Sequence, residues 1–294
     1  MKIIVADHLG MCFGVRDAIA QAERLAGQAP LTILGELVHN PVVGERLRAA
    51  GVREKSHPSD LPQPGGTRVM ITAHGASDRR HEELRARGFE TADATCPLVR
   101  RAHHQLRVLV AAGYFPVVIG KRGHVEVQGL TEDFAHAVAV ESTRDVADLP
   151  QHPRYGIISQ TTQPIEHVRR VVAEIERARP DAEVRFIDTV CQPTKDRQQA
   201  LKALVEQAET IVVVGGRTSN NTMQLVKTCS AAGRKVVHVE RAEELPAGSF
   251  HGVRSVGVTA GTSTLPETVA AVVERLKQIS RFAPTESNQD ETTS

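Results

Sequence analysis

Strand-like apolar runs alternate with helical periodicity along most of this chain of 294 residues. In the helical stretches apolar residues recur every three or four positions, as at Val15, Ala18, Ile19 and Ala22. The runs between them, such as "RVMI" and "TIVVV", are short and rich in β-branched residues. Because helices that cross over a sheet join parallel strands, this alternation predicts an α/β protein with mainly parallel sheets.

Three cysteines stand just before, or at the start of, three of these helical repeats. "DATCPLV" contains Cys96 and "DTVCQPT" contains Cys191, each with an Asp three residues before the Cys and a Pro shortly after it. Cys12 precedes a third such helix. Cys96 lies 84 residues after Cys12, and Cys191 lies another 95 residues on, which predicts three similar units. The spacing by itself also allows coincidence, since any α/β chain repeats its element order.

The predicted units extend over residues 13–95, 96–190 and 191–281. Each begins with a helix, continues with two strand-like runs, and ends in a third strand that leads to the next cysteine. The last unit lacks that third strand, and "KIIVA" of the N-terminal segment 1–12 is expected to supply it. We expect a final helix around Thr268 to Ile279 and a disordered tail over the polar residues 282–294.

Charge and composition exclude several classes of function. The 36 Lys and Arg balance 35 Asp and Glu, so a net charge of +1 gives no general attraction to nucleic acid or anionic membrane. Aromatic residues make up only 3% of the sequence, which argues against a stacking platform for single strands. Since no apolar run suits a signal peptide or a membrane span, we expect a cytoplasmic protein with reduced or metal-binding cysteines.

Thiols at three helix starts are a pattern that suits a metal centre. In parallel α/β units, ligands bind beyond the carboxyl ends of the strands, where the strand-to-helix loops gather. A helix N-terminus favours the thiolate, and three thiolates can hold an iron–sulfur cluster while leaving one iron without a protein ligand. Because no C-x-x-C pattern is present, three ordinary buried cysteines stay the alternative on spacing alone. Cys229, within "QLVKTCSAAG", is given no role.

Polar residues at other loop positions suggest a site for an anion. His39, His74 and His124 each end a strand-like run. Hydroxyls and amides stand at further helix starts: Thr161 and Thr162 before Pro164, then Ser219, Asn220 and Asn221, and finally Ser263 beside a predicted capping box from Thr264 to Glu267. Each alone is more often a cap than a ligand, but together with helix N-termini they suit a phosphate group. No P-loop or G-x-G-x-x-G stretch supports nucleotide binding.

"GHVEV" is interpreted as extended chain, which would put Glu126 on the same side as His124. A carboxyl group beside a metal and a phosphate can deliver a proton in a dry site. The alternative is an exposed strand glutamate without a role.

With these residues in view, the chain resembles the 4-hydroxy-3-methylbut-2-enyl diphosphate reductases, the terminal iron–sulfur enzymes of the non-mevalonate isoprenoid pathway. The resemblance runs from about Lys2 to Ile279 and is carried by "GMCFGV", "GELVHNPVV", "TAHG", "DATCPLV", "GHVEV", "SQTT", "DTVCQPTKDRQ", "GGRTSNNT" and "TAGTSTL". It implies a trefoil of three α/β units around one [4Fe–4S] cluster with an open iron site. It also implies reductive dehydroxylation of the allylic diphosphate to isopentenyl and dimethylallyl diphosphate, with electrons from a ferredoxin- or flavodoxin-like donor.

The resemblance implies a role for each candidate residue. Cys12, Cys96 and Cys191 would be the cluster ligands, and Glu126 would be the proton source. The diphosphate and the substrate hydroxyl would be held by His39, His74, His124, Thr161, Ser219, Asn220, Asn221 and Ser263. The chain departs from the family pattern at Val125, where the family has Pro, at Pro193, where it has Ala, and at Asn220, where it often has Ser.

Two rival functions fit these residues less well. A non-catalytic sensor could hold a cluster or zinc on the same scaffold, but it would not need a phosphate site and Glu126. A cluster-dependent dehydratase would eliminate water without consuming reductant.

Overall fold

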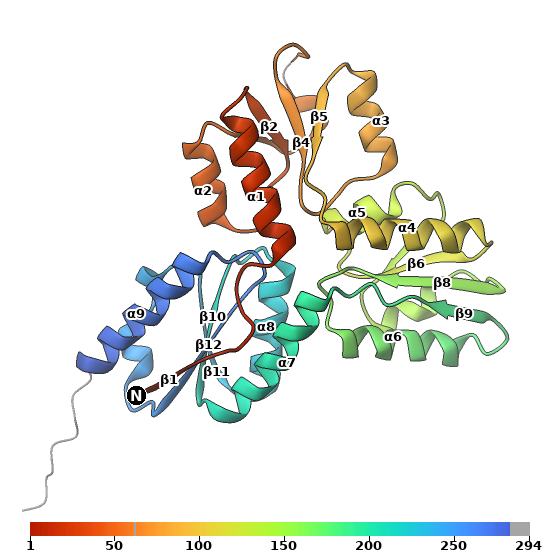
Figure 1. Cartoon of the computed structure of the whole chain (residues 1–294). Coiled ribbons are helices and arrows are strands. Elements are labelled where there is room, and N and C mark those ends of the chain that lie inside the picture. The colour runs from red at the N-terminus through yellow and green to blue at the C-terminus, as the bar shows by residue number, and fades with distance from the viewer. Residues whose placement is uncertain (62, 283–294) are drawn as a thin grey trace, which may run out of the picture.

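The computed structural model describes residues 1–61 and 63–282 and shows three α/β units arranged as three lobes (Figure 1). Each unit contains one four-stranded sheet in which every strand pair is parallel. The predicted α/β class with parallel sheets is therefore confirmed. Within the described ranges, no helix combines the length and the apolar character needed to cross a membrane.

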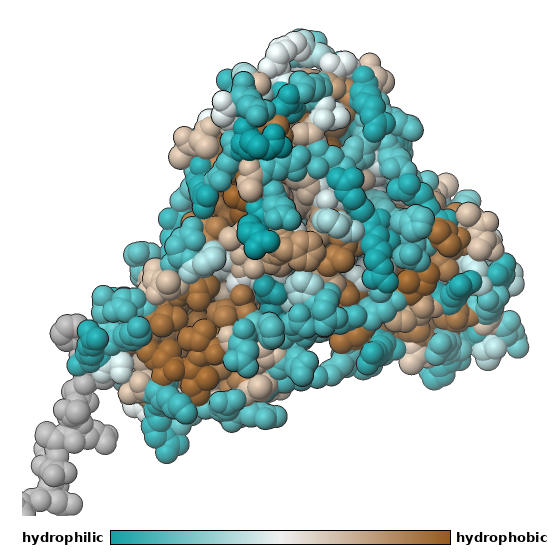
Figure 2. All heavy atoms as spheres, in the orientation of Figure 1, coloured by the Kyte–Doolittle hydropathy of each residue, from teal (hydrophilic) through white to brown (hydrophobic). Residues whose placement is uncertain are grey.

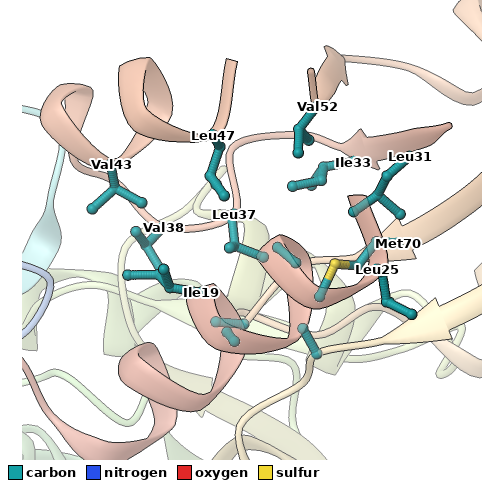
Figure 3. Packing of buried hydrophobic residues seen from close by; sticks show 14 of the residues in the cluster. Ile19, Leu25, Leu31, Ile33, Leu37, Val38, Val43, Leu47, Val52 and Met70 are labelled. Atoms are coloured by element: carbon teal, nitrogen blue, oxygen red, sulfur yellow. The ribbon is translucent and has the colours of Figure 1, made fainter. Parts of the chain in front are cut away.

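The first unit follows the N-terminal strand. Its elements are α1 (Phe13–Ala26), β2 (Leu31–Leu34), α2 (Pro41–Ala49), β3 (Arg53–Lys55), a 3₁₀ turn (Pro58–Asp60), β4 (Arg68–Ile71), α3 (Asp78–Ala86) and β5 (Glu90–Asp93). The sheet order is β3-β2-β4-β5. Figure 3 shows Ile19 and Leu25 of α1 packed with Ile33 of β2 and Leu47 of α2 in one buried cluster. Each such side chain stabilises the fold by roughly 1.5–3 kcal/mol, so this core firmly holds the strands whose ends form the site.

The second unit repeats this arrangement. Its elements are α4 (Pro97–Ala111), β6 (Phe115–Ile119), α5 (Val125–Thr131), β7 (Val138–Val140), a 3₁₀ turn (Thr143–Asp148), β8 (Arg154–Ser159), α6 (Ile165–Ala178) and β9 (Glu183–Phe186). The sheet order is β7-β6-β8-β9. Every residue of β6 and β8 after the first is buried, as expected for central strands covered on both faces.

The third unit combines the two ends of the chain. Its elements are α7 (Gln192–Gln207), β10 (Thr210–Val214), α8 (Asn220–Ala231), β11 (Lys235–Val239), 3₁₀ turns (Ala242–Glu244 and Ala247–Phe250), β12 (Ser255–Ala260), α9 (Pro266–Phe282) and β1 (Lys2–Val5). In the sheet order β1-β12-β10-β11, the first strand pairs with β12, from Lys2 with Ser255 to Val5 with Val258. β1 thus holds the place that β5 and β9 hold in the other sheets. Figure 2 shows an apolar area over this unit, where β1 and β12 lie in Figure 1.

The prediction of three strands per sheet was wrong, because each sheet has a fourth strand at its edge: β3, β7 and β11. β3 reads "REK" and β7 reads "VAV", so both are too short, and β3 too polar, to show an apolar period. Short edge strands of this kind present little unpaired backbone. β11, "KVVHV", is an apolar run that the element pattern passed over.

Two local predictions also need correction. "GHVEV" is not extended: His124 is the N-cap of α5, and its ring accepts a hydrogen bond from the Glu126 N–H. The alternating valines suggested a strand, but the cap overrides that pattern. The capping box from Thr264 is wrong as well, since α9 begins at Pro266 and the Thr264 hydroxyl donates to the Val214 carbonyl. The predicted tail lies outside the described residues, apart from Phe282, which ends α9.

Candidate active site

One pocket lies where the three lobes meet, and loop residues of all three units line it. The pocket is lined by all twelve candidate residues: Cys12, Cys96, Cys191, His39, His74, His124, Glu126, Thr161, Ser219, Asn220, Asn221 and Ser263. They come together because the strands of each sheet are parallel, so the loops after their carboxyl ends gather at one edge. Apolar side chains complete the wall, among them Phe13, Val38, Leu98 and Val99.

The three cysteines occupy equivalent positions in the three units. Each is the N-cap of a long helix, Cys12 for α1, Cys96 for α4 and Cys191 for α7, and none of the three side chains caps its helix. Each backbone N–H donates to a carbonyl in the loop after a central strand: Thr262 for Cys12, Ala73 for Cys96 and Thr161 for Cys191, at 3.0, 3.1 and 2.9 Å. The backbones of the three cysteines are therefore held in the same way, and the Cys191 thiol also donates to the Thr194 hydroxyl at 3.1 Å.

Burial raises the pKa of the Cys96 thiol, and it raises the pKa of Cys191 to about 11. In both cases the negative charge of Cys12 and Glu126 adds to the shift. The expectation that a helix N-terminus favours the thiolate is thus outweighed by desolvation. A positive group must enter the pocket for these thiols to ionise at neutral pH.

Gly14 permits the close approach of two cysteine-bearing segments. A Cβ on Gly14 would lie 2.5 Å from the Sγ of Cys96. Real Cβ atoms do not come so close to a sulfur, so any other residue here would push Cys96 or the start of α1 away. Gly216 likewise permits a close approach of two segments beside the histidines, because a Cβ there would lie 2.3 Å from the His39 carbonyl oxygen. The sequence reasoning missed both glycines; the flanking "GMCFGV" and "GGRTSNN" were their only signals.

His39, His74 and His124 form one cluster. Their ring centroids lie 4.4 Å apart for His39 and His74, 5.2 Å for His39 and His124, and 5.4 Å for His74 and His124. Burial holds the pKa of His74 well below its usual range and lowers that of His124 to about 4, with the charge of His39 adding to both shifts. His74 and His124 are therefore neutral at pH 7.

Hydrogen bonds decide which ring nitrogens of this cluster donate. His124 Nδ1 accepts from the Glu126 N–H at 3.2 Å, so the proton of the neutral ring is on Nε2. His74 Nε2 is buried and has no hydrogen-bond partner among the residues that the structure describes. Although the cluster has ring nitrogens within 4.8 Å of one another, a donor at His124 Nε2 suits an anion and opposes a metal ion.

Glu126 is fully enclosed at the side of the same pocket. Burial raises its pKa to about 7, against the opposing effect of hydrogen bonds from Thr161. The Thr161 N–H donates to Glu126 Oε1 at 2.6 Å. A carboxyl group with this pKa is about half protonated at neutral pH, which is the condition a general acid needs.

The loops around the start of α8 join the third unit to the histidine cluster. Ser219 is the N-cap of α8, and Asn221 Oδ1 accepts from the Thr262 N–H at 3.0 Å. The Ser263 hydroxyl donates to the His39 carbonyl at 3.3 Å, and its own carbonyl accepts from the Asn40 amide at 2.6 Å. Asn40, the N-cap of α2, therefore also ties two units together.

The three departures from the family pattern all fall at helix starts. Val125 is the first residue of α5, and Pro193 is the second residue of α7. The first N–H groups of a helix have no partner within the helix, so the unbonded N–H of Val125 and the missing N–H of Pro193 cost little stability. Asn220 begins α8, and its amide donates to the Thr162 hydroxyl at 3.0 Å. Thr162 also lines the pocket, although sequence reasoning gave the site role to Thr161 alone.

Comparison with known proteins extends over nearly the whole chain. A family model described as "LytB protein" matches residues 3–277. The "4-hydroxy-3-methylbut-2-enyl diphosphate reductase" of Geobacter sulfurreducens is 37% identical over 282 residues, covering 95% of this chain and 98% of that one. The protein of the same name from Aquifex aeolicus is 35% identical over 290 residues, covering 95% and 97%.

Two solved structures agree with this family match. The "E-1-hydroxy-2-methyl-but-2-enyl-4-diphosphate reductase" of Plasmodium falciparum superposes with a TM-score of 0.88 at 25% identity, covering 94% of this chain and 88% of that one. A second structure, titled "(E)-4-Hydroxy-3-methyl-but-2-enyl Diphosphate Reductase, the Terminal Enzyme of the Non-Mevalonate Pathway", gives a TM-score of 0.67 at 34% identity and covers 95% and 100%. These matches confirm the resemblance, and the chain belongs to the LytB family of 4-hydroxy-3-methylbut-2-enyl diphosphate reductases.

Proposed function

We propose that this protein catalyses the reductive dehydroxylation of (E)-4-hydroxy-3-methylbut-2-enyl diphosphate to isopentenyl and dimethylallyl diphosphate. The observation that carries the proposal is the meeting of three kinds of group in one pocket: three thiols, three imidazoles and a buried carboxyl group. Curated relatives named for this activity over the whole length of the chain support it.

The donor set fits a [4Fe–4S] cluster, one per chain, held by Cys12, Cys96 and Cys191. When bound, the cluster would pass on the two electrons of an external donor, one at a time, at an iron that no cysteine of the chain ligates. Within residues 1–61 and 63–282, the three sulfurs are not a group of ligand atoms that lie within 4.8 Å of one another. A single zinc ion with Zn–S bonds of about 2.3 Å would need them that close, so this arrangement does not favour zinc.

The diphosphate group would be bound at the opposite side of the pocket. His124 offers a neutral N–H, and His74 has a buried nitrogen without a partner. The N-terminus of α8, with Ser219 and Asn221, contributes its exposed amides and its positive dipole end. We also assign His39, Asn220 and Ser263 to this end of the pocket and Thr161 to the neighbourhood of the substrate hydroxyl.

Glu126 would hold and deliver the proton that the reaction consumes. Its raised pKa keeps the acid form populated at neutral pH, and the Thr161 N–H fixes the carboxyl group in the pocket wall. The apolar residues Phe13, Val38 and Val99 would exclude water, so the proton goes to the substrate.

The remaining assignments stay proposals. We infer an electron donor of the ferredoxin or flavodoxin kind and a cytoplasmic location. We also infer unit boundaries at 13–95, 96–190 and 191–281, with residues 1–12 completing the third unit. The membership of β1 in the sheet of β10, β11 and β12 supports that last point.

The experiment is anaerobic purification followed by measurement of iron, acid-labile sulfide and turnover of the allylic diphosphate. We expect a brown protein with about four iron atoms per chain. Cys96→Ala should lose both colour and turnover, whereas Cys229→Ala should keep both, because Cys229 is buried in the core of the third unit. A colourless Cys96→Ala protein with normal turnover would refute the proposal. A brown wild type without turnover would favour the sensor.

A further inference from the structure

Arg197 is a buried cation that links two of the three cysteine segments. It lies on α7, six residues after Cys191, and is only 6% exposed. Its Nε donates to the Gly10 carbonyl at 3.1 Å, Nη2 donates to the same oxygen, and Nη1 donates to the Pro193 carbonyl at 2.7 Å. Gly10 stands two residues before Cys12, so one guanidinium holds the loop of Cys12 against the helix of Cys191.

These bonds engage all three guanidinium nitrogens of Arg197 but do not balance its charge. In the described part of the chain, no carboxylate oxygen lies within 4.0 Å of its guanidinium, while the surface arginines form many ion pairs. A buried charge without an opposite charge is costly, by several kcal/mol in general. Burial lowers the pKa of Arg197, and negative charge on Cys12, Cys191 and Asp196 opposes that shift. Two of these three groups are thiols of the pocket, which would bring their negative charge beside Arg197 once a bound cluster holds them as thiolates.

We propose that Arg197 is a positioning residue that clamps the Cys12 loop to α7 and supplies the counter-charge for the cluster's thiolates on that side. The inference rests on the function proposed above. Arg197 touches neither substrate nor cluster in this assignment; it acts through Gly10 and through its field. The reduction potential of an iron–sulfur cluster depends on the net charge around it, so loss of a nearby cation makes the cluster harder to reduce.

Arg197→Gln removes the charge, and Arg197→Lys keeps the charge but loses the two-pronged bond to Gly10. Arg179→Gln is the matched control. Arg179 likewise donates to backbone carbonyls, that of Ala178 at 3.1 Å and that of Leu149 at 2.8 Å. It lies at the end of α6, outside the pocket. All three variants and the wild type are purified anaerobically with their clusters. Iron per chain, thermal midpoint and the midpoint potential of the cluster, from a redox titration followed by electron paramagnetic resonance, are measured for each.

We expect Arg197→Gln to shift the cluster potential to more negative values, Arg197→Lys to restore it toward the wild type, and Arg179→Gln to leave it unchanged. If Arg197→Gln does not retain iron, retention by Arg197→Lys and by Arg179→Gln still supports the counter-charge. A fully loaded Arg197→Gln protein with the wild-type potential would overturn the inference, as would equal iron loss in all three variants. The wild type in the same experiment tests the proposed function by itself: if it carries a full cluster and is active, a failed result for the Arg197 variants overturns only the role of Arg197.

Discussion

Thr161 uses both sides of its backbone to connect Glu126 with Cys191. Its N–H donates to Glu126 Oε1 at 2.6 Å, and its carbonyl accepts from the Cys191 N–H at 2.9 Å. A single residue in the loop after β8 thus holds both the proposed proton source and a proposed cluster ligand. The relative position of the Glu126 carboxyl group and the Cys191 backbone is therefore set by a single peptide segment.

Glu126→Gln should keep the fold and the cluster but lose most of the turnover. Gln can still accept from the Thr161 N–H, but it has no proton to give. General acid catalysis contributes about 10²- to 10⁴-fold, so we expect a loss of kcat in that range with little change in KM. Steady-state kinetics at equal iron content measures this, and normal kcat in the variant would rule out the role.

The pH dependence of turnover should follow Glu126. Since its pKa is about 7, the acid form decreases as pH rises through that value, and kcat should fall on the alkaline side. A profile that stays flat from pH 6 to 9 would contradict this assignment. The same titration, absent from Glu126→Gln, identifies the group.

The stability of the protein should report the same carboxyl group. The folded pKa is raised above the ordinary value of 4.5, so the folded state binds more protons and loses stability as pH rises from about 4.5 to about 7. A shift of this size corresponds to roughly 3 kcal/mol. Glu126→Gln lacks this cost, so its thermal midpoint relative to the wild type should be higher at pH 8 than at pH 4.5. A difference that does not change with pH would contradict the prediction.

Gly14→Ala should lower cluster content without unfolding the protein. The added Cβ would lie 2.5 Å from the Cys96 sulfur, so one of the two segments must move. Gly248→Ala is the control, because a Cβ there meets nothing within 4 Å. We expect a several-fold loss of iron per chain for Gly14→Ala alone. Full iron content in that variant would show that the contact is not limiting.

His124→Ala should weaken the binding of inorganic diphosphate. Its neutral N–H would be lost, and a hydrogen bond to a charged group contributes about 1.5–3 kcal/mol, or roughly 10- to 150-fold in affinity. His152→Ala is the control, because His152 lies outside the pocket and its ring bonds the backbone of Arg154. Calorimetric titration of the cluster-loaded proteins measures the affinities. Equal affinities for both variants would count against a diphosphate site at the histidines.

Asn220→Ala and Thr162→Val, alone and combined, test what Asn220 does. Its amide donates to the Thr162 hydroxyl in the structure, so the two changes should be non-additive in stability by about 1 kcal/mol. If Asn220 also binds diphosphate, as the family resemblance implies, affinity should fall further when Asn220→Ala is added to Thr162→Val. Unchanged affinity at that step would restrict Asn220 to the link between the units.

Local pattern sufficed for much of the fold. The α/β class, the helices after the three cysteines, and the helix start at Ser219 followed from apolar period and capping chemistry, which act between residues close in sequence. The same local reasoning failed for β3 and for Glu126. A three-residue polar edge strand is stabilised by its neighbour in the sheet, and the helix after His124 depends on a ring that caps it.

The sequence by itself singled out the candidate site residues: three cysteines before helices, three histidines at strand ends, and one glutamate. Only the tertiary structure decided how they behave. Desolvation sets the pKa of Glu126 to about 7 and that of Cys191 to about 11, and burial depends on atoms far away in the chain. The contact between Gly14 and Cys96 and the bond from Arg197 to Gly10 likewise join segments that no local pattern relates. Packing of three units around one pocket creates these contacts, and neither spacing nor composition contains them.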